Sequence, residues 1–360
     1  MKLLIAAGGT GGHVFPALEV ARAWEQLGSQ RGETYSVVFV GTARGLETRL
    51  VPEAGYPLAL IRAAGLKGIG GLRFVRNAAI LPLGFWDSAA ILSKHRPDVA
   101  LGIGGYASGP IMLTAVLQGL PTAVFEPNFD PGFTNRVLGG MVTRVATAFP
   151  STADRWGSRA VVTGCPVRQE FFQIALRDHQ SPFRILITGG SQGAEPINRA
   201  LVAALPLLKS RQDDLFFVHQ TGEYGYNSVR IAYAQSEFQA DIVPFINDMA
   251  EQFARADLII CRAGAITAAE VAAAGRAAIF IPFGAAADAH QLGNAQWLHG
   301  CGAGRVIRQE HLTPERLVGD IFSLLDCPAE MRDMEQRVHA LARPRAAVNL
   351  AELLAGIAAL

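Results

Sequence analysis

His13 stands directly after a run of glycines, GGTGG (8–12), where the apolar stretch 2–7 gives way to a helix-like segment. An imidazole with an ordinary pKa of about 6.5 can accept a proton at neutral pH. In the first turn of a helix, the positive end of the helix dipole disfavours the cation and keeps the ring neutral and basic. These features make His13 a candidate general base, although it could instead bind phosphate or pack locally.

Glycine loops follow two further apolar runs, at GIGGYASG (102–109) and GGSQG (189–193). Backbone N–H groups at a glycine-rich strand-to-helix turn suit an anion, usually phosphate. Tight strand–helix packing explains one such loop equally well, but three of them favour the phosphate interpretation. The GGTGG loop is not the dinucleotide fingerprint, because its third glycine position is Val14 and the second strand ends in Gly41-Thr42 rather than an acid. No GK[ST] follows either GGTGG or GGSQG, which excludes a Walker loop.

Ser191 and Glu270 are the polar side chains best placed to hold a nucleotide. Ser191, with the backbone of Gly190 and Gln192, suits a pyrophosphate, or it could simply cap the helix expected to start near residue 194. Glu270 lies one turn after Thr267 on the same helix face, where a carboxylate could accept both ribose hydroxyls. The alternative is an ordinary capping box, which T-x-x-E spells out.

Length and composition describe an apolar protein of two domains. The chain has 360 residues, of which 50% are hydrophobic and 18% charged. Its formal net charge of +1 argues against nucleic-acid binding through bulk charge. The four cysteines form no CxxC pair or zinc pattern, and scattered thiols fit a reducing cytosol. We expect no signal peptide and no transmembrane helix.

The elements that must position these residues repeat one pattern, an apolar strand, a glycine-bearing loop and a helix. Near-continuous β-branched runs between helices indicate parallel sheets buried on both faces. The segment 184–208 echoes 2–28, so the sequence predicts an α/β chain of two doubly wound, Rossmann-like domains joined near 164–170. Ligands of such sheets bind beyond the carboxyl ends of the strands, and we expect the two sheets to face a central cleft.

Seven motifs in series give the chain a family resemblance over essentially its whole length. They are GGTGGHVFPA (8–17), GGYASGP (104–110), EPNFDPGFTNR (126–136), GCPVR (164–168), GGSQGA (189–194), CRAGAITAAE (261–270) and DAHQLGNA (288–295). Together they resemble the MurG family of bacterial peptidoglycan glycosyltransferases, which have the GT-B fold. The resemblance implies an inverting transfer of N-acetylglucosamine from UDP-N-acetylglucosamine to lipid I, undecaprenyl-pyrophosphoryl-N-acetylmuramoyl-pentapeptide, which forms lipid II.

The same resemblance assigns domains and site residues. It implies an acceptor and membrane-facing domain of residues 1–166 plus 344–360 and a donor domain of residues 167–343. The expected bases are His13 and, as a weaker candidate, Glu126. The acceptor pyrophosphate is assigned to Gly104, Gly105, Tyr106 and Ser108. Substrate binding is assigned to Thr10, Gly11, Gly12, Asn128, Arg168, Gly190, Ser191, Gln192, Ile246, Ala265, Ile266, Thr267, Glu270, His290 and Gln291, with Glu270 on the ribose and the Ile246 backbone on the uracil.

Four positions depart from the family pattern. Phe125 and Pro127 replace polar residues of an HEQN stretch, Cys165 replaces an asparagine, and Ala289 lies in the DAHQ stretch. Phe125 matters most, because the polar side chain expected near the cleft is lost there.

The segment 66–86 interleaves cations with apolar residues, which suits the surface of an anionic membrane. We expect peripheral binding at the cytoplasmic face of the cell membrane through Lys67, Arg73, Arg76, Phe85 and Trp86, although core packing would explain most of the apolar residues. No acidic pair flanks the nucleotide motifs, so we expect no metal cofactor, with stimulation by a divalent cation left open. Cell-wall and division proteins are further expected partners.

Two other functions stay open at this point. A UDP-N-acetylglucosamine 2-epimerase would share the donor motifs but would need neither a membrane patch nor an acceptor pyrophosphate loop. A non-catalytic nucleotide-sugar-binding scaffold would need no base at position 13.

Overall fold

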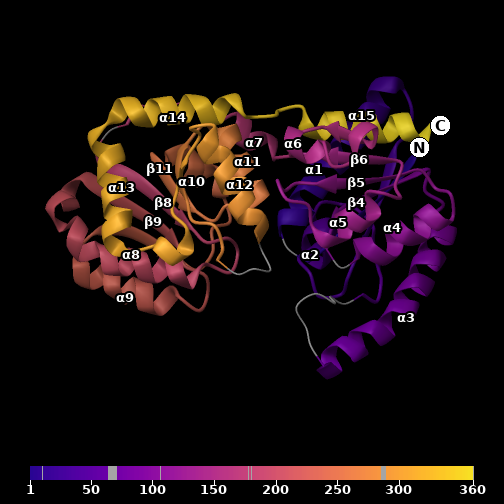
Figure 1. Cartoon of the computed structure of the whole chain (residues 1–360), viewed down its shortest axis with the longest axis horizontal. Coiled ribbons are helices and arrows are strands. Elements are labelled where there is room, and N and C mark those ends of the chain that lie inside the picture. Colours follow the sequence, from indigo (N-terminus) through magenta and orange to yellow (C-terminus); the bar gives the residue numbers. More distant parts are fainter. Residues whose placement is uncertain are drawn as a thin grey trace. The chain divides into compact units, whose positions relative to one another are not determined.

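The computed structural model describes residues 1–9, 11–63, 71–105, 107–176, 178–179, 181–284 and 289–359, with the backbone alone for 71–80 and 289. The chain divides into two compact units (Figure 1). Unit 1 comprises Met1–Arg168 and Arg343–Leu360, and unit 2 comprises Gln169–Ala342. The sequence placed these boundaries at 166/167 and 343/344.

Unit 1 is built on a seven-stranded sheet whose neighbouring strands pair in parallel, in the order β3-β2-β1-β4-β5-β6-β7. Its strands are β1 Lys2–Ala7, β2 Ser36–Gly41, β3 Leu58–Leu60, β4 Val99–Gly104, β5 Thr122–Glu126, β6 Arg144–Thr147 and β7 Ala160–Val162. The central strands are almost fully buried, as expected for continuous apolar runs in a parallel sheet.

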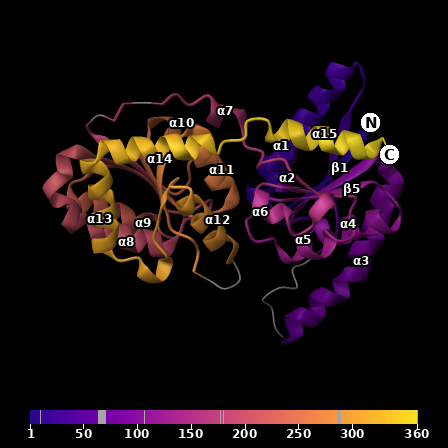
Figure 2. The same ribbon diagram turned by 45° about the horizontal axis from the view of Figure 1, so that its top comes forward.

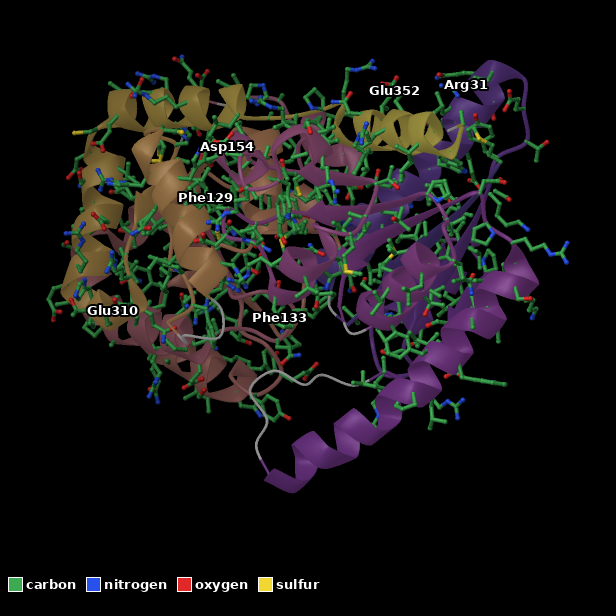
Figure 3. The ribbon with its side chains drawn as sticks, turned by 45° about the vertical axis from the view of Figure 1, so that its right-hand side comes forward. Arg31, Phe129, Phe133, Asp154, Glu310 and Glu352 are labelled. Atoms are coloured by element: carbon green, nitrogen blue, oxygen red, sulfur yellow. The ribbon has the colours of Figure 1, made fainter. Side chains whose placement is uncertain are left out.

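Helices cover this sheet and include one from the end of the chain. They are α1 Gly11–Arg31, α2 Glu47–Glu53, α3 Gly71–His95, α4 Ser108–Leu117, α5 Phe133–Leu138, α6 Pro150–Ala153 and α15 Ala346–Ala358, with a 3₁₀ turn at Gly157–Arg159. Figure 2 shows α15 lying along α1, and Glu352 on its exposed side is labelled in Figure 3. The C-terminal segment therefore belongs to the core of unit 1.

Unit 2 repeats the design with a six-stranded parallel sheet in the order β10-β9-β8-β11-β12-β13. Its strands are β8 Phe183–Thr188, β9 Leu215–Gln220, β10 Gln239–Val243, β11 Leu258–Cys261, β12 Ala277–Phe280 and β13 Arg305–Val306. Its helices are α7 Gln169–Phe172, α8 Glu195–Leu208, α9 Tyr226–Ser236, α10 Met249–Arg255, α11 Ala265–Ala274, α12 Ala289–Gly300, α13 Pro314–Asp326 and α14 Pro328–Ala340, with 3₁₀ turns at Lys209–Asp214 and Gln309–His311.

The prediction of two doubly wound, parallel α/β domains is confirmed. In each unit the strand order reverses between two central neighbours, β1 and β4 in unit 1 and β8 and β11 in unit 2. Successive connections leave these neighbours in opposite directions, and doubly wound sheets usually bind their ligands beyond the carboxyl ends of such strands. All three predicted glycine loops follow one of these four strands.

Candidate functional site

In unit 1, His13 lies between the two loops that follow the central strands. Its Nδ1 is 3.1 Å from the carbonyl oxygen of Gly8, after β1. A Cβ built on Gly104, at the end of β4, would lie only 2.8 Å from its Nε2. Because a carbonyl oxygen only accepts, the neutral ring donates from Nδ1 and keeps a lone pair on Nε2.

The surroundings of His13 favour its neutral form. Burial lowers the pKa of His13, and the Gly8 hydrogen bond and the charge of Glu47 offset that effect only in part. The ring also lies in the first turn of α1, as the sequence predicted. A neutral imidazole with a free Nε2 lone pair has the protonation state that a general base requires.

The loop assigned to the acceptor pyrophosphate is packed closely against the loop after β1. Gly104 and Gly105 have φ of 124° and 80°, and a Cβ on Gly105 would overlap the Gly8 carbonyl, so the two loops pass backbone against backbone. Ser108 is fully buried, with its Oγ 2.9 Å from the Ala6 carbonyl and 2.7 Å from that of Gly104. The Ser108 hydroxyl therefore connects β1 with the end of β4, and the assignment of this loop to the acceptor pyrophosphate stays a prediction. Thr10 and Tyr106 lie outside the described residues.

Glu126, the second candidate base, is a buried structural carboxylate. It accepts hydrogen bonds from the backbone N–H of Asn128 and Gly132 and from the side-chain amides of Asn128 and Asn135. Four donors leave it no free lone pair facing a substrate, which argues against a role as base. The loop it shapes leads into α5, whose first residue, Phe133, is 64% exposed (Figure 3).

Phe125 and Cys165, two of the departures from the family pattern, are buried. Phe125 lies on β5 with no exposed surface, so its substitution changes the core of unit 1. Arg168, at the end of unit 1, holds its guanidinium 4.9 Å from the centre of the Phe15 ring on α1. Phe15 follows the candidate base His13 by two residues on α1.

Glu47 is a functional candidate that the sequence did not single out. Its carboxylate is fully buried at the start of α2 and accepts from the backbone N–H of Gly9 and from the N–H and hydroxyl of Thr42. A Cβ on Gly8, Gly41 or Gly45 would overlap or crowd this carboxylate. The glycines of GTARGLE (41–47) were the available signal, since they leave space for a side chain rather than for a ligand.

In unit 2, the GGSQG turn after β8 exposes Ser191 and Gln192. Gly190 and Gly193 have positive φ, and a hydrogen bond from the Gly193 N–H to the Gly190 carbonyl closes the turn. The N-cap of α8 is Ala194, without a side-chain cap, so Ser191 does not cap this helix. Its hydroxyl therefore remains available to a ligand.

The loop after β11 lies at the same carboxyl edge of the unit 2 sheet as the GGSQG turn, because β8 and β11 are parallel neighbours. α11 begins at Ala265 with Gly264 as its N-cap and no side-chain cap, which excludes the capping-box interpretation of Thr267 and Glu270. Glu270 is buried, and the pKa of Cys261 is raised by burial and by the charge of Glu270. Glu270 thus lies on the helix that follows β11, and its charge acts on the last residue of that strand.

Arg262 is a second residue that sequence reasoning missed, although it stands in the CRAGAITAAE motif. Its Nη1 donates to the carbonyls of Ile281 and Pro282, and its guanidinium lies 5.2 Å from the centre of the Phe283 ring. Burial lowers the pKa of Arg262. Its position immediately after a buried strand was the available signal.

The remaining donor-site predictions lie on neighbouring loops of unit 2. The Gln291 side-chain oxygen accepts from the Phe283 N–H at 3.1 Å, which leaves its amide nitrogen to a ligand. Nδ1 of His290 is buried without a hydrogen-bond partner among the described residues. Ile246 is buried after β10, as expected for a residue that would act through its backbone.

α3 carries the membrane prediction. On its described half, Trp86 is 75% exposed and Leu83 43% exposed, and they lie one turn apart. Phe85 is partly buried. Lys67 lies outside the described residues, and the side chains of Arg73 and Arg76 are not described. Within the described ranges, no helix is long and apolar enough to cross a membrane.

Comparisons with known proteins agree over both units. Residues 3–147 match the glycosyltransferase family 28 N-terminal domain and residues 184–350 its C-terminal domain. A UDP-N-acetylglucosamine--N-acetylmuramyl-(pentapeptide) pyrophosphoryl-undecaprenol N-acetylglucosamine transferase of Myxococcus xanthus is 45% identical, over 98% of this chain and 92% of its own length. The enzyme of the same name from Citrifermentans bemidjiense is 44% identical, over 96% and 97%.

Two solved structures share the architecture. Acinetobacter baumannii MurG covers 99% of both chains with a TM-score of 0.79 and 34% identity. A UDP-GlcNAc 2-epimerase from Neisseria meningitidis, bound to UDP-GlcNAc, covers 99% of this chain and 100% of its own with a TM-score of 0.71. The epimerase is only 14% identical, so that likeness extends to the fold alone.

Proposed function

The chain belongs to glycosyltransferase family 28, and we infer that it carries out the reaction for which its curated relatives are named. It transfers N-acetylglucosamine from UDP-N-acetylglucosamine to lipid I and forms lipid II in peptidoglycan synthesis. The observation that carries this inference is identity of 44–45% over nearly the whole chain to enzymes named for this transfer. The epimerases that share the fold are only 13–14% identical, and the two relatives above are named as enzymes rather than as scaffolds.

We propose His13 as the base of this transfer. The acceptor hydroxyl gives its proton to Nε2 while its oxygen forms a bond to the anomeric carbon, and the bond from that carbon to the UDP oxygen breaks. Support comes from the donated Nδ1 proton, the lowered pKa of the ring and its place at a strand-order reversal. UDP leaves with the electron pair of the broken bond.

The donor is proposed to bind the carboxyl edge of the unit 2 sheet. The N–H groups and hydroxyl of the Ser191 turn would receive the pyrophosphate, where they stabilise the charge that develops on leaving UDP. Glu270 would accept the ribose hydroxyls, the Ile246 backbone would read the uracil, and Gln291 with His290 would hold the sugar. Support comes from the exposure of the Ser191 turn and the common edge at which β8, β11 and β12 end.

The decisive experiment is transfer from labelled UDP-N-acetylglucosamine to a lipid I analogue. The wild type should make the lipid II analogue, and His13→Gln should lower kcat by about 10²–10⁴ with UDP affinity retained. His311→Gln, at an exposed histidine of unit 2, is the matched control. Epimerisation or UDP release without lipid would refute the transferase function. A raised KM with unchanged kcat would assign His13 to phosphate binding instead.

We further propose peripheral binding of α3 to the cytoplasmic face of the membrane, supported by the exposure of Trp86 and Leu83. Sedimentation with anionic phosphatidylglycerol vesicles should fall several-fold on joint Trp86→Ala and Leu83→Ala substitution. Leu117→Ala, at an equally exposed apolar residue of α4, should not change it. Equal sedimentation of the double variant and the wild type would refute this role.

We propose that the transfer needs no resident metal. Within the described residues, no group of three or more His, Cys, Asp or Glu side chains could hold one. The groups proposed to bind the pyrophosphate are the neutral N–H groups and hydroxyl of the Ser191 turn. Transfer should persist in EDTA, and a gain on adding Mg²⁺ would then reflect stimulation through the substrate pyrophosphate. Contacts with cell-wall and division proteins stay a prediction.

A further inference from the structure

Gly8 and Gly9 are joined by a single peptide group whose two polar atoms are both engaged. Its carbonyl oxygen lies 3.1 Å from Nδ1 of His13. Its N–H donates to Oε2 of Glu47 at 2.9 Å. The buried carboxylate and the candidate base are therefore connected through one amide, Glu47 Oε2 to Gly9 N–H and Gly8 C=O to His13 Nδ1–H.

We propose that Glu47 is a positioning residue for His13, acting through the Gly8–Gly9 peptide group. This inference rests on the proposed role of His13 as base. A carboxylate that accepts an amide proton polarises the amide and makes its carbonyl a stronger acceptor, because linked hydrogen bonds reinforce one another. The stronger carbonyl holds the proton on Nδ1, orients the ring and stabilises the imidazolium that forms when Nε2 takes the acceptor proton.

The surroundings of Glu47 are built to hold an ionised carboxylate. Oε1 accepts from the N–H and Oγ1 of Thr42 at 2.9 and 3.1 Å, so three donors compensate the buried charge. Gly41 and Gly45 enclose it, since a Cβ on either would overlap its side chain. A carboxylate fixed in this way cannot turn away from the Gly9 N–H.

The charges around the ring give the proposal a pH dependence. From the side of α2, the ring faces Glu47, whose charge raises its pKa, and from the side of β4 it meets the backbone of Gly104. Among the described residues, no other charge is found to shift it. Removing the negative charge at position 47 should therefore make His13 a weaker base with a lower pKa.

Glu47→Gln tests the proposal most directly, because it removes the charge and keeps the shape of the side chain. The glutamine oxygen can serve the two Thr42 donors, but its NH₂ then meets the Gly9 N–H, donor against donor. We expect kcat for transfer to the lipid I analogue to fall roughly tenfold, with KM for UDP-N-acetylglucosamine nearly unchanged. The acid limb of the kcat/KM profile should move down by about 0.5–1 pH unit. Glu53→Gln, at an exposed glutamate of the same helix, should behave as wild type.

Nitrogen-15 NMR of histidine-labelled protein tests the hydrogen-bonded connection from Glu47 to His13 without an activity assay. The His13 signal is assigned by its loss in His13→Gln. In the wild type, the neutral His13 ring should carry its proton on Nδ1, and its pKa should fall in Glu47→Gln. A neutral ring protonated on Nε2 would overturn the proposal even if Glu47→Gln does not fold. An unshifted His13 pKa in a folded Glu47→Gln variant would also overturn it. If the NMR results hold but no lipid is made, the proposed function fails and the connection stands.

Discussion

Glu270 illustrates, at the scale of a residue, how a buried carboxylate can select a ligand. It is buried on α11 near the end of β11, where proposed ribose hydroxyls would donate to it. A hydrogen bond to a charged group contributes about 1.5–3 kcal/mol. Glu270→Gln should therefore lower kcat/KM for UDP-N-acetylglucosamine by about 10–100-fold, chiefly through KM.

The 2′-deoxyribose analogue of the donor separates this role from a structural one. The wild type should discriminate against the analogue, and Glu270→Gln should discriminate far less, because the lost hydroxyl no longer meets a charged acceptor. Glu251→Gln, on α10, serves as the control since its carboxylate is exposed. Unreduced discrimination in Glu270→Gln would assign the carboxylate to structure alone.

Residue types and spacing predicted the place of some residues, but they did not predict the contacts of others, for a physical reason. The position of His13 in the first turn of a helix follows from local sequence, and the structure has it there. Ser108 and Glu126 stood in equally suggestive motifs, yet both are buried: the Ser108 hydroxyl bonds backbone carbonyls, and the Glu126 carboxylate accepts from backbone and side-chain amides. The glycines around Glu47 were a signal for a buried side chain, but its bond to the Gly9 N–H could not be predicted, because Gly9 lies 38 positions away in the sequence.

At the scale of elements, apolar runs followed by glycines correctly marked strands and the loops after them. The strand order, which brings β1 beside β4 and β8 beside β11, depends on pairing between distant segments. α3 continues through Pro82 and Gly84. A Cβ at Gly84 would lie 2.6 Å from the Arg62 carbonyl, so this glycine permits close packing.

Two loops of unit 2 interlock through glycines, and this predicts an effect on the Ser191 turn. A Cβ on Gly193, at φ 75°, would overlap the Thr221 carbonyl. Left-handed backbone costs an alanine about 1–2 kcal/mol, and the overlap adds strain. Gly193→Ala should therefore lower stability by about 3 kcal/mol and weaken UDP binding, as followed by thermal unfolding and calorimetry.

Gly190→Ala provides the matched comparison. Its φ of 88° carries the same left-handed cost, but a Cβ there meets nothing within 4 Å. We expect a fall in Tm of about 2–8 °C, from the backbone cost alone. Equal losses in the two alanine variants would contradict the interlocking of the loops.

At the scale of the molecule, the chain enters unit 2 at Gln169 and leaves it at Ala342. His179 follows the entry into unit 2 by ten residues. Its Nδ1 lies 2.9 Å from Oδ1 of Asp257, just before β11, and its Nε2 lies 3.2 Å from Oε2 of Glu335 on α14, near the exit. Burial alone would lower the pKa of His179, but hydrogen bonds and charge from the two carboxylates outweigh it and raise the pKa to about 9. The protonated His179 ring therefore connects the first segment of unit 2 with the start of β11 and with α14.

This connection makes the stability of unit 2 depend on pH. Because the folded pKa lies above the unfolded value of about 6.5, the contribution is complete below about pH 6.5 and is lost as the pH rises through about 9. Its size is on the order of 3 kcal/mol. The difference in unfolding free energy between wild type and His179→Gln should therefore shrink by that amount between pH 6.5 and 10, as measured by urea titration. His311→Gln, at an exposed histidine of the same unit, is the control and should show no such change. A pH-independent difference for His179→Gln would mean that the ring is held by packing rather than by charge.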